Sequence, residues 1–375
     1  MNNNKLYVGV VTYHRANNYG AVLQAYALCQ YLHKLGCNSE IVDYWPNYHA
    51  VVYRPLIWDK KAFAKRDILH KLAYIFSMIF CSFKRYVRNR NFNRFRKRFL
   101  NIGYKEGMVT YDAAFYGSDT IWNVWKQNDL HQGFDSVFWG DEKVCAQYKF
   151  SYAPSMGNVI DTKDTFLHCQ KYLKNFASIS VRESDLQKKL QEWGWSNITK
   201  VVDPTLLLCS EDWNLLLNNK IVSNKYILCY NLENSPVIDS IANQLSKETG
   251  LKIISLTGNV KRTFSHYILD TAGPDSFLSL FKGADYILTS SFHGVVFSII
   301  FNKQFCFHSE KETERISSLL DSCNLTDRFV KKDSVSVFHK QIEYDVVNKR
   351  LDAMRQESYR YISNCLNMVK NGKNM

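Results

Sequence analysis

One stretch of the chain, from Gly273 to His308, constrains the fold more than any other. Its sequence, GPDSFLSLFKGADYILTSSFHGVVFSIIFNKQFCFH, predicts a helix, a strand, a tight turn, a second helix and a second strand. Pro274 suits the first turn of a helix, and Asp285 to Thr289 is the short apolar run of a strand buried on both faces. Val295 to Phe301 is apolar on every side, which predicts a buried helix. This order of elements is typical of an α/β protein.

The turn in this stretch, Ser290-Ser291-Phe292-His293-Gly294, is the first candidate site. A strand that runs directly into a helix leaves free amides at the helix N-terminus, which suit a phosphate or a carboxylate. In open α/β sheets ligands bind beyond the carboxyl ends of the strands, which is where His293 stands. The positive end of a helix favours a neutral imidazole that accepts a proton near neutral pH. A capping or packing histidine is the alternative interpretation.

The length of 375 residues exceeds what one hydrophobic core usually holds, so we expect two domains. We place an N-terminal α/β domain at residues 1–215, a C-terminal α/β domain at 216–340 and a C-terminal helix at 341–375. The ten cysteines are scattered singly, which favours reduced thiols over disulfides or a metal site. Neither a signal-peptide pattern nor an apolar run of the roughly 18 residues that a membrane span requires is found, so we expect a cytoplasmic protein.

The net charge of +13 is concentrated in one segment. Residues 60–100 contain thirteen Lys or Arg and one acid, Asp67, and so carry +12 of that charge. This basic insertion includes a 12-residue apolar run, Leu72 to Phe83, followed by arginines and aromatic residues. Such a run fits an element lying on an anionic membrane surface, and a helix pair packed on the domain with a solvated basic face is the alternative. No nucleic-acid motif accompanies the charge, so we expect no nucleic-acid binding.

The N-terminal domain begins with a βαβ pattern: strand Leu6–Thr12, helix Ala21–Leu35 and strand Glu40–Asp43. The loop before the helix is too poor in glycine for a dinucleotide-binding fingerprint, so the pattern does not predict NAD binding. Asn18 and Gly20 in this loop are candidates to shape a turn around an anion or sugar hydroxyls. Ordinary turn chemistry is the alternative.

Further strand ends contribute polar side chains. Behind the expected strand Ala113–Tyr116, a carboxylate, an indole and an amide form a set suited to a sugar, and capping of a helix is the alternative for the carboxylate. The residues of this set are Asp119, Trp122 and Asn123, and Ser118 beside them is a further candidate for substrate binding. The strand Tyr148–Ala153 is followed by Ser155, which is a further candidate for substrate binding.

The strand Ala177–Val181 ends at Arg182, whose guanidinium matches the geometry of carboxylate and phosphate. Pairing of Arg182 with Glu183 or with another acid is the alternative. A second arginine, Arg315, follows the His293 turn in the sequence. Two α/β units with a cleft between them are the architecture that these elements imply.

Together these stretches resemble the polysaccharide pyruvyl transferase family over residues 6–330. The similar segments are NNYGAVLQAYAL, YGSDTIWN, YAPSMG, ISVRESD, VVDPTLLL and, above all, GPDSFLSLFKGADYILTSSFHGVVFSIIFNKQF. The resemblance implies two Rossmann-like domains facing a cleft, similar to the GT-B glycosyltransferases. It also implies transfer of pyruvate from phosphoenolpyruvate to two hydroxyls of a sugar in a bacterial surface polysaccharide or its lipid-linked precursor. The products are a cyclic ketal and phosphate, and no cofactor or metal is required.

The resemblance implies a role for each candidate residue. His293 is the acid/base group, Arg182 holds an anionic group of the donor, and Asp119 orients or deprotonates the acceptor. The residues that line the phosphate site are Ser290, Ser291 and Gly294.

One departure from the family pattern concerns the donor. Family members with ketal-forming activity often have R-L-H-G where this chain has Ser291-Phe292-His293-Gly294, so an arginine is absent at position 291. Arg315 is the candidate to replace it.

Two other functions fit the same features: a glycosyltransferase that uses a nucleotide sugar, and a non-catalytic glycan-binding module. The basic insertion is expected to bring the protein to the inner face of the plasma membrane.

Overall fold

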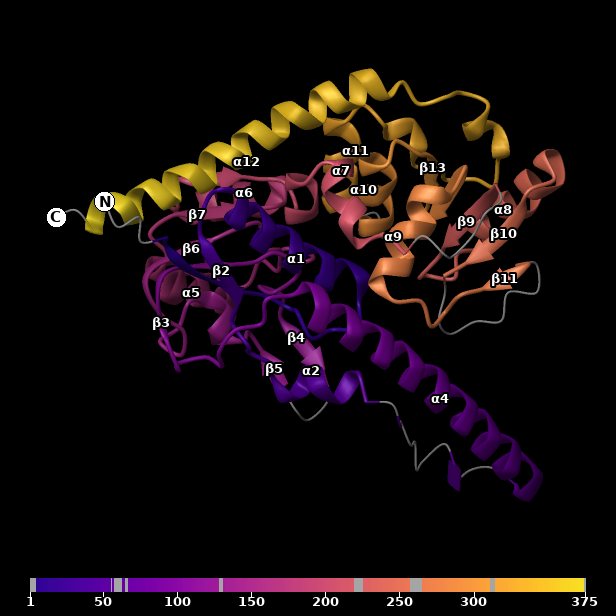
Figure 1. Cartoon of the computed structure of the whole chain (residues 1–375), viewed down its shortest axis with the longest axis horizontal. Helices are drawn as coiled ribbons and strands as arrows, with labels where there is room; N and C mark the ends of the chain where they lie inside the picture. The colour runs from indigo at the N-terminus through magenta and orange to yellow at the C-terminus, as the bar shows by residue number, and fades with distance from the viewer. Residues whose placement is uncertain are drawn as a thin grey trace.

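The computed structural model describes residues 5–54, 56, 63–64, 67–127, 131–218, 225–256, 265–310 and 314–373. Within these residues the chain forms two separate parallel β-sheets flanked by helices, one on each side of the molecule in Figure 1. This arrangement confirms the α/β fold that the sequence predicts.

The first sheet comes from the N-terminal part of the chain. Its strands, in spatial order, are β2 (Asn38–Ile41), β1 (Tyr7–Val11), β3 (Thr110–Tyr116) and β6 (Cys145–Ser151). All neighbouring pairs are parallel. Beside β6 lies a parallel pair, β7 (Ile179–Val181) and β8 (Ile198–Lys200), joined to it by a bridge between Phe150 and Ser178. A short antiparallel pair, β4 (Trp125–Gln127) and β5 (His131–Gly133), lies apart from this sheet.

The second sheet comes from the C-terminal part of the chain. Its strands, in spatial order, are β11 (Tyr267–Ile268), β10 (Lys252–Ser255), β9 (Tyr226–Tyr230), β12 (Tyr286–Thr289) and β13 (Gln304–Phe307). They too are all parallel. The central strand β9 is buried along its whole length, which explains its continuous apolar sequence. The domain boundary at residues 215 and 216 separates the two sheets in the sequence and remains our proposal.

Helices connect and cover the strands. They are α1 (Tyr19–Lys34), α2 (Asn47–Val52), α4 (Ile68–Phe99), α5 (Lys163–Tyr172), α6 (Ser184–Glu192), α7 (Ser210–Trp213), α8 (Pro236–Thr249), α9 (Pro274–Gly283), α10 (Phe292–Ile300), α11 (Glu314–Ser322) and α12 (Tyr344–Lys373). Helix α10 is buried at every position except His293, as its uniformly apolar sequence predicts.

Helix α1 joins the two halves. Twelve of its sixteen residues are buried, because it packs on the first sheet and also on α9. The ring of Tyr19 stacks on Phe277 with 4.4 Å between centroids, and its hydroxyl donates a hydrogen bond to the carbonyl of Ala272 at 2.8 Å. One hydrophobic core therefore runs from the first sheet to the second.

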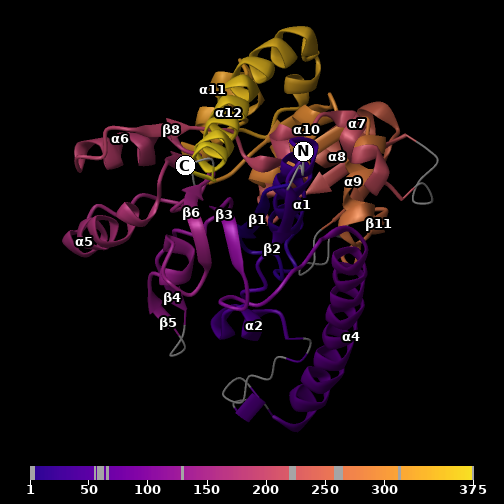
Figure 2. The same cartoon turned by 60° about the vertical axis from the view of Figure 1, so that its left-hand side comes forward.

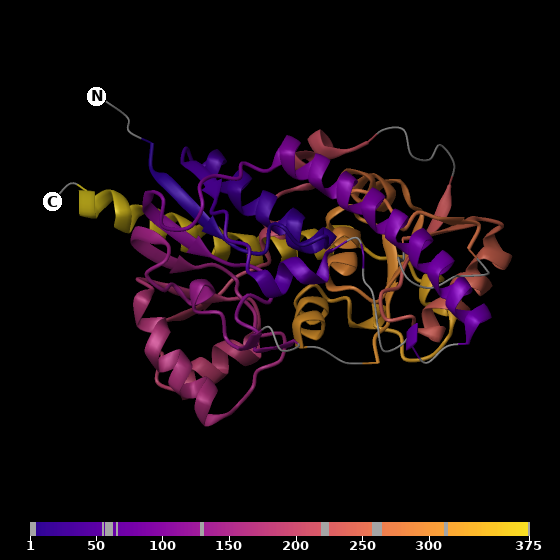
Figure 3. The same cartoon turned by 90° about the horizontal axis from the view of Figure 1, so that it is seen from below.

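The C-terminal helix α12 crosses back from the second sheet to the first (Figures 1 and 3). Near its start the hydroxyl of Tyr344 donates to the carbonyl of Ser298 in α10 at 3.2 Å. Farther along, Ser358 accepts the amide of Val202, and Tyr361 donates to the carbonyl of Ser151 at the end of β6. The helix therefore straps the two sheets together.

Helix α4 corrects one expectation for the basic insertion. Residues 68–99 form one helix of 32 residues that begins at the capping carboxylate of Asp67, so the apolar run and the arginines after it share a single helix and do not form a helix pair. Residues 60–62 and 65–66 of the insertion lie outside the described residues. Its N-terminal half extends away from both sheets (Figure 2). No helix within the described part of the chain is long and apolar enough to cross a membrane.

Candidate active site

The candidate active site lies where strand ends of the first sheet meet the N-terminus of α10. Ser118 and Asp119 follow β3, Ser155 follows the end of β6, and Arg182 follows β7. The amide of Ser155 donates to the carbonyl of Asp119 at 3.0 Å, which ties two of these loops together. His293 lies in the first turn of α10, directly after β12 of the second sheet.

A buried ion pair forms the base of the site. Nη1 of Arg182 lies 2.8 Å from Oδ2 of Asp203, and Nε of Arg182 lies 2.8 Å from Oε1 of Glu183. Both carboxylates and the guanidinium are almost fully buried. The pairing of Arg182 with Glu183, which the sequence leaves open, is therefore present. Nη2 of Arg182 is nevertheless buried without a hydrogen-bond partner among the described residues.

The protonation states of this group follow from burial and charge. Burial works to lower the pKa of Arg182, but the charges of Glu183, Asp203 and Asp119 hold it above its usual value. Burial works to raise the pKa of Asp203, yet the proximity of His293 and the charge of Arg182 hold it well below its usual range. Burial raises the pKa of Glu183 despite Arg182. Arg182 and Asp203 therefore form an ionised pair.

His293 bridges the two halves of the molecule. Its Nε2 lies 3.7 Å from Oδ2 of Asp203, which is longer than a hydrogen bond, and no described group bonds to Nε2. On its other edge the imidazole lies against Gly20 in the first turn of α1, and a Cβ on Gly20 would overlap the ring. The side chain is 12% exposed. The imidazole thus lies between the carboxylate of Asp203 and the first turn of α1, and it is itself part of the first turn of α10.

Arg315, at the start of α11, joins the group from the second half. The guanidinium carbons of Arg182 and Arg315 lie 4.8 Å and 5.7 Å from the ring centroid of Phe292. Burial, and then the like charge of Arg182, lower the pKa of Arg315. Its Nε is buried without a hydrogen-bond partner among the described residues. An anion would satisfy both unpaired nitrogens and relieve the repulsion between the two cations.

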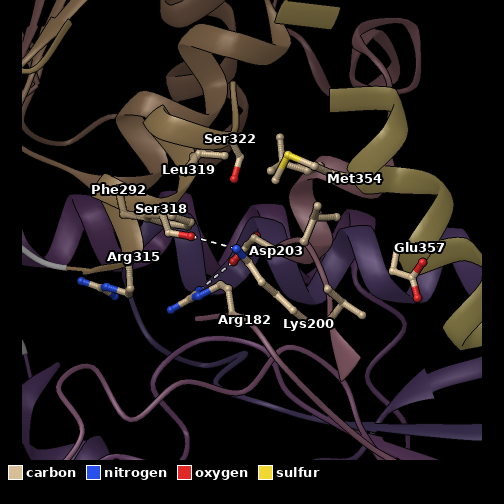
Figure 4. Close-up of a pocket in the computed structure, with 13 residues that line it drawn as sticks. Arg182, Lys200, Asp203, Phe292, Arg315, Ser318, Leu319, Ser322, Met354 and Glu357 are labelled. Carbon is tan, nitrogen blue, oxygen red and sulfur yellow. Dashed lines mark hydrogen bonds and ion pairs between the residues drawn. The ribbon is translucent and has the colours of Figure 1, made fainter. Parts of the chain in front are cut away.

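Both arginines line a cavity of about 220 Å³ under α12 (Figure 4). Its wall includes Asp203, Phe292 and Lys200, whose Nζ donates to Ser318 at 2.9 Å. The guanidinium groups of Arg182 and Arg315 lie on the same side of this cavity. The cavity therefore has three cations against the carboxylates of Asp203 and Glu357.

Several predicted ligands hold the loops of the site in place, and the hydroxyl of Ser118 also lies 3.5 Å from both Nη1 of Arg182 and Oδ2 of Asp203. The hydroxyl of Ser290 accepts the amides of Leu232 and Glu233 at 2.8 Å and 3.1 Å, so it fixes the loop after β9. Ser118 donates to the carbonyl of Ala153 at 2.6 Å. The hydroxyl of Ser155 accepts the amide of Gly157 at 2.9 Å.

At the helix termini, three predicted residues keep the backbone in place. Asn18 is exposed and caps α1 by accepting the amide of Ala21 at 3.3 Å. Ser291 is the N-cap of α10, although its side chain makes no capping bond. Gly294 lies so close to Thr289 that a Cβ would overlap the threonine hydroxyl.

Trp122 does not fit the expected sugar-binding set. Its indole is fully buried, stacks on Trp139 with 4.4 Å between centroids, and donates to the carbonyl of Phe138 at 3.0 Å. The ring is therefore a core residue and not a platform for a sugar. Asn123 is half-buried. Asp119 accepts the amide of Thr120 at 2.8 Å, and its negative charge raises the pKa of Arg182 and opposes the lowering of the pKa of Arg315.

The sequence analysis missed Asp203 as a site residue. The feature that could have identified Asp203 is a lone carboxylate before a proline in VVDPTLLL, three residues after the end of β8. Oδ1 of Asp203 accepts from the amide and hydroxyl of Thr205, which directs Oδ2 toward Arg182. No cluster of metal-ligating side chains occurs in the described ranges of the chain.

Comparison with known proteins places this geometry in a family. The family model for polysaccharide pyruvyl transferase matches residues 18–309, which include Arg182, Asp203 and His293. The chain belongs to the polysaccharide pyruvyl transferase family. Membership in this enzyme family implies pyruvyl transfer to a polysaccharide, with a pyruvyl donor and a polysaccharide acceptor. None of the curated proteins matches the sequence.

Solved structures resemble this chain in fold. UDP-N-acetylglucosamine 2-epimerase from Rickettsia bellii superimposes with a TM-score of 0.51 at 9% identity over 98% of each chain. The UDP-GlcNAc 2-epimerase from Methanocaldococcus jannaschii gives 0.46 at 10% identity, covering 94% of this chain and 92% of that one. The glycosyltransferase SnogD from Streptomyces nogalater gives 0.42 at 9% identity, covering 98% and 100%. The likeness to the Rickettsia bellii enzyme extends over the whole chain, and the fold is GT-B-like, with two parallel sheets.

Proposed function

We propose that the protein transfers pyruvate from phosphoenolpyruvate to two hydroxyls of a sugar in a bacterial surface polysaccharide or its lipid-linked precursor. One observation carries this proposal. An imidazole, His293, and two guanidinium groups with unpaired nitrogens, Arg182 and Arg315, meet at the helix N-terminus between the two sheets. A donor with both a carboxylate and a phosphate requires this combination of cations and a proton-transfer group.

The donor is anionic at two ends, and the site offers two kinds of anion partner. Nη2 of Arg182 and Nε of Arg315 would take one anionic group from the cavity side. The first amides of α10, next to Ser291 and Gly294, would take the other, because a helix N-terminus favours a phosphate. Arg315 packs on the same Phe292 ring as Arg182, which supports its replacing the arginine absent at position 291.

The chemistry follows from these positions. His293 gives a proton to the methylene carbon of the donor, so the neighbouring carbon becomes electrophilic and is attacked by a sugar hydroxyl. Attack by a second hydroxyl expels phosphate and closes the ketal. Of the two hydroxyl protons, one ends on the methyl group through His293 and the other leaves with phosphate. The carboxylate of Asp203, 3.7 Å from Nε2, stabilises the imidazolium at each protonated stage, and Asp119 orients the acceptor.

His293→Gln tests this assignment, because glutamine keeps polarity but cannot titrate. Phosphate release from phosphoenolpyruvate with an acceptor glycan should fall by about 10²–10⁴, while calorimetry should show nearly unchanged affinity for the donor. A matched control is His33→Gln on α1, whose imidazole bonds only the carbonyl of Ser39 and should leave turnover intact. A His293→Gln protein that is fully active but less stable would show that His293 contributes to packing and not to catalysis.

Comparing the binding of phosphoenolpyruvate with that of nucleotide sugars distinguishes pyruvyl transfer from glycosyl transfer. Calorimetry with phosphoenolpyruvate, UDP-sugars and GDP-sugars should detect only the first. Tight binding of a nucleotide sugar, without binding of phosphoenolpyruvate, would favour glycosyl transfer on the same fold. Acceptor binding without either donor would favour a glycan-binding module.

A further inference from the structure

Helix α4 carries a row of large apolar side chains that no described part of the molecule covers. Their exposures lie between 52% and 78%. The residues are Leu69, Leu72, Phe76, Ile79, Phe80 and Phe83. At 3.6 residues per turn, this spacing places all of them on one face, which extends into solvent with the N-terminal half of the helix (Figure 2).

The same face turns basic closer to the body of the molecule. Beyond Phe83 the face continues through Tyr86 to exposed cations that line a shallow groove. These cations are Arg90, Arg94, Lys97 and Arg98. Helix α4 contains no acidic residue, so nothing on the helix neutralises them. One continuous face therefore combines an apolar outer half with a basic inner half.

Contacts on the other sides of α4 fix its orientation. Nη1 of Arg88 donates to the carbonyl of Asp270 at 2.9 Å, and Nδ2 of Asn91 donates to the carbonyl of Thr271 at 2.8 Å. Nη1 of the buried Arg96 donates to the carbonyl of Ala16 at 3.2 Å. Because these bonds reach both halves of the molecule, the helix cannot rotate to bury its apolar row.

We propose that this face of α4 docks on the surface of an anionic bilayer. Laid along the surface, the phenylalanines reach below the head groups, and the arginines and Lys97 meet lipid phosphates. The charge pattern disfavours a second copy of this chain as the occupant. Parallel pairing of two such faces would oppose cation to cation, and antiparallel pairing would place desolvated cations on the apolar halves. The proposal is independent of the reaction that the enzyme catalyses.

Vesicle sedimentation of the full chain tests this docking. The probes are vesicles of phosphatidylcholine alone and of phosphatidylcholine mixed with phosphatidylglycerol. The protein should sediment with the mixed vesicles and dissociate as salt increases. Arg94→Gln with Arg98→Gln should weaken partitioning about fivefold per charge removed. Phe76→Ser with Phe80→Ser should weaken it about tenfold per ring. All four side chains lie on the exposed face, so the variants should fold normally.

Matched double variants elsewhere on the surface serve as controls. Lys163→Gln with Lys188→Gln removes two exposed cations, and Leu167→Ser with Leu215→Ser removes two exposed apolar side chains. Neither pair should change partitioning. Equal binding to both vesicle types at all salt concentrations would overturn the proposal. So would a dimer, seen by analytical ultracentrifugation, that Phe76→Ser with Phe80→Ser dissociates while vesicle binding is absent.

Discussion

Gly20 lies directly against the imidazole of His293, so the first turn of α1 and the first turn of α10 meet at one ring. The glycine comes from the half of the chain that forms the first sheet, and the histidine follows a strand of the second sheet. Any side chain at position 20 would occupy space that the imidazole fills. The position of the proposed acid/base group therefore depends on a residue without a side chain in the other half of the molecule.

Gly20→Ala should displace His293 and slow pyruvyl transfer. Alanine is preferred to glycine in helices by up to about 1 kcal/mol, so without the overlap the change would stabilise α1. With the overlap the imidazole has to move, and misplacement of a catalytic group by about 1 Å costs about a hundredfold in rate. The measurement is phosphate release from phosphoenolpyruvate in the presence of acceptor, set beside the melting temperature.

The control for this change is Gly194→Ala. No atom lies within 4 Å of a Cβ at Gly194, although its φ of +96° makes alanine strained. That strain costs about 1–2 kcal/mol of stability and should leave turnover per folded molecule unchanged. A Gly20→Ala protein that is both fully active and more stable would show that the contact with His293 does not matter.

Asp203→Asn should destabilise the protein at neutral pH and reduce its sensitivity to acid. Breaking a buried ion pair costs about 3–5 kcal/mol, because Arg182 loses a partner. The folded pKa of Asp203 lies below its unfolded value of about 3.9, so its contribution is present above that pH and is lost as pH falls toward the folded pKa. Urea unfolding at a series of pH values should show the gap between wild type and variant narrowing below about pH 4.

A comparison variant for this pH series is Asp321→Asn, an exposed carboxyl in α11. Its unfolding curve should follow the wild type at every pH. Glu183 acts in the opposite sense to Asp203, because its raised pKa favours the protonated carboxyl in the folded state. A gap between wild type and Asp203→Asn that stays constant down to the acid limit would mean that Asp203 is not the ionised partner of Arg182.

Arg315→Gln should separate donor binding from stability. A hydrogen bond to a charged group contributes about 1.5–3 kcal/mol, so calorimetry should find phosphoenolpyruvate bound roughly tenfold to a hundredfold more weakly. The melting temperature without ligand should hold or rise, because the change removes a buried charge that lies near Arg182. Arg94→Gln on α4, which removes an exposed guanidinium that does not line the cavity, is the matched control for both quantities. Unchanged donor affinity would remove Arg315 from the site.

Much of the fold is readable in the sequence where burial is uniform. The runs at β9, β12 and α10 are apolar on all sides because these elements are enclosed, so their positions follow from composition alone. A pair of helices was one of two alternatives for the basic insertion, although residues 68–99 contain neither glycine nor proline to break a single helix. The absence of glycine and proline predicts one continuous helix here.

The candidate site is readable only in part, because strand ends can be located but side-chain partners cannot. Arg182 and His293 follow strands, which marks them as accessible to a ligand. The pairing of Arg182 with Asp203 joins positions 21 residues apart, and the contact of Gly20 with His293 joins the two halves of the chain. Such pairs depend on how the sheets pack, which local periodicity does not encode.

Trp122 illustrates the same limit, because its sequence context suits a sugar platform while its ring is enclosed by Trp139 and Phe138. Trp122→Ala should lower the free energy of unfolding by about 3–5 kcal/mol, as for other large buried side chains, and leave turnover per folded molecule unchanged. Trp45→Ala, at a ring 40% exposed, should cost much less. Urea unfolding and initial rates on the same preparations decide the matter. A Trp122→Ala protein with full stability and weakened acceptor binding would show that Trp122 contacts the sugar.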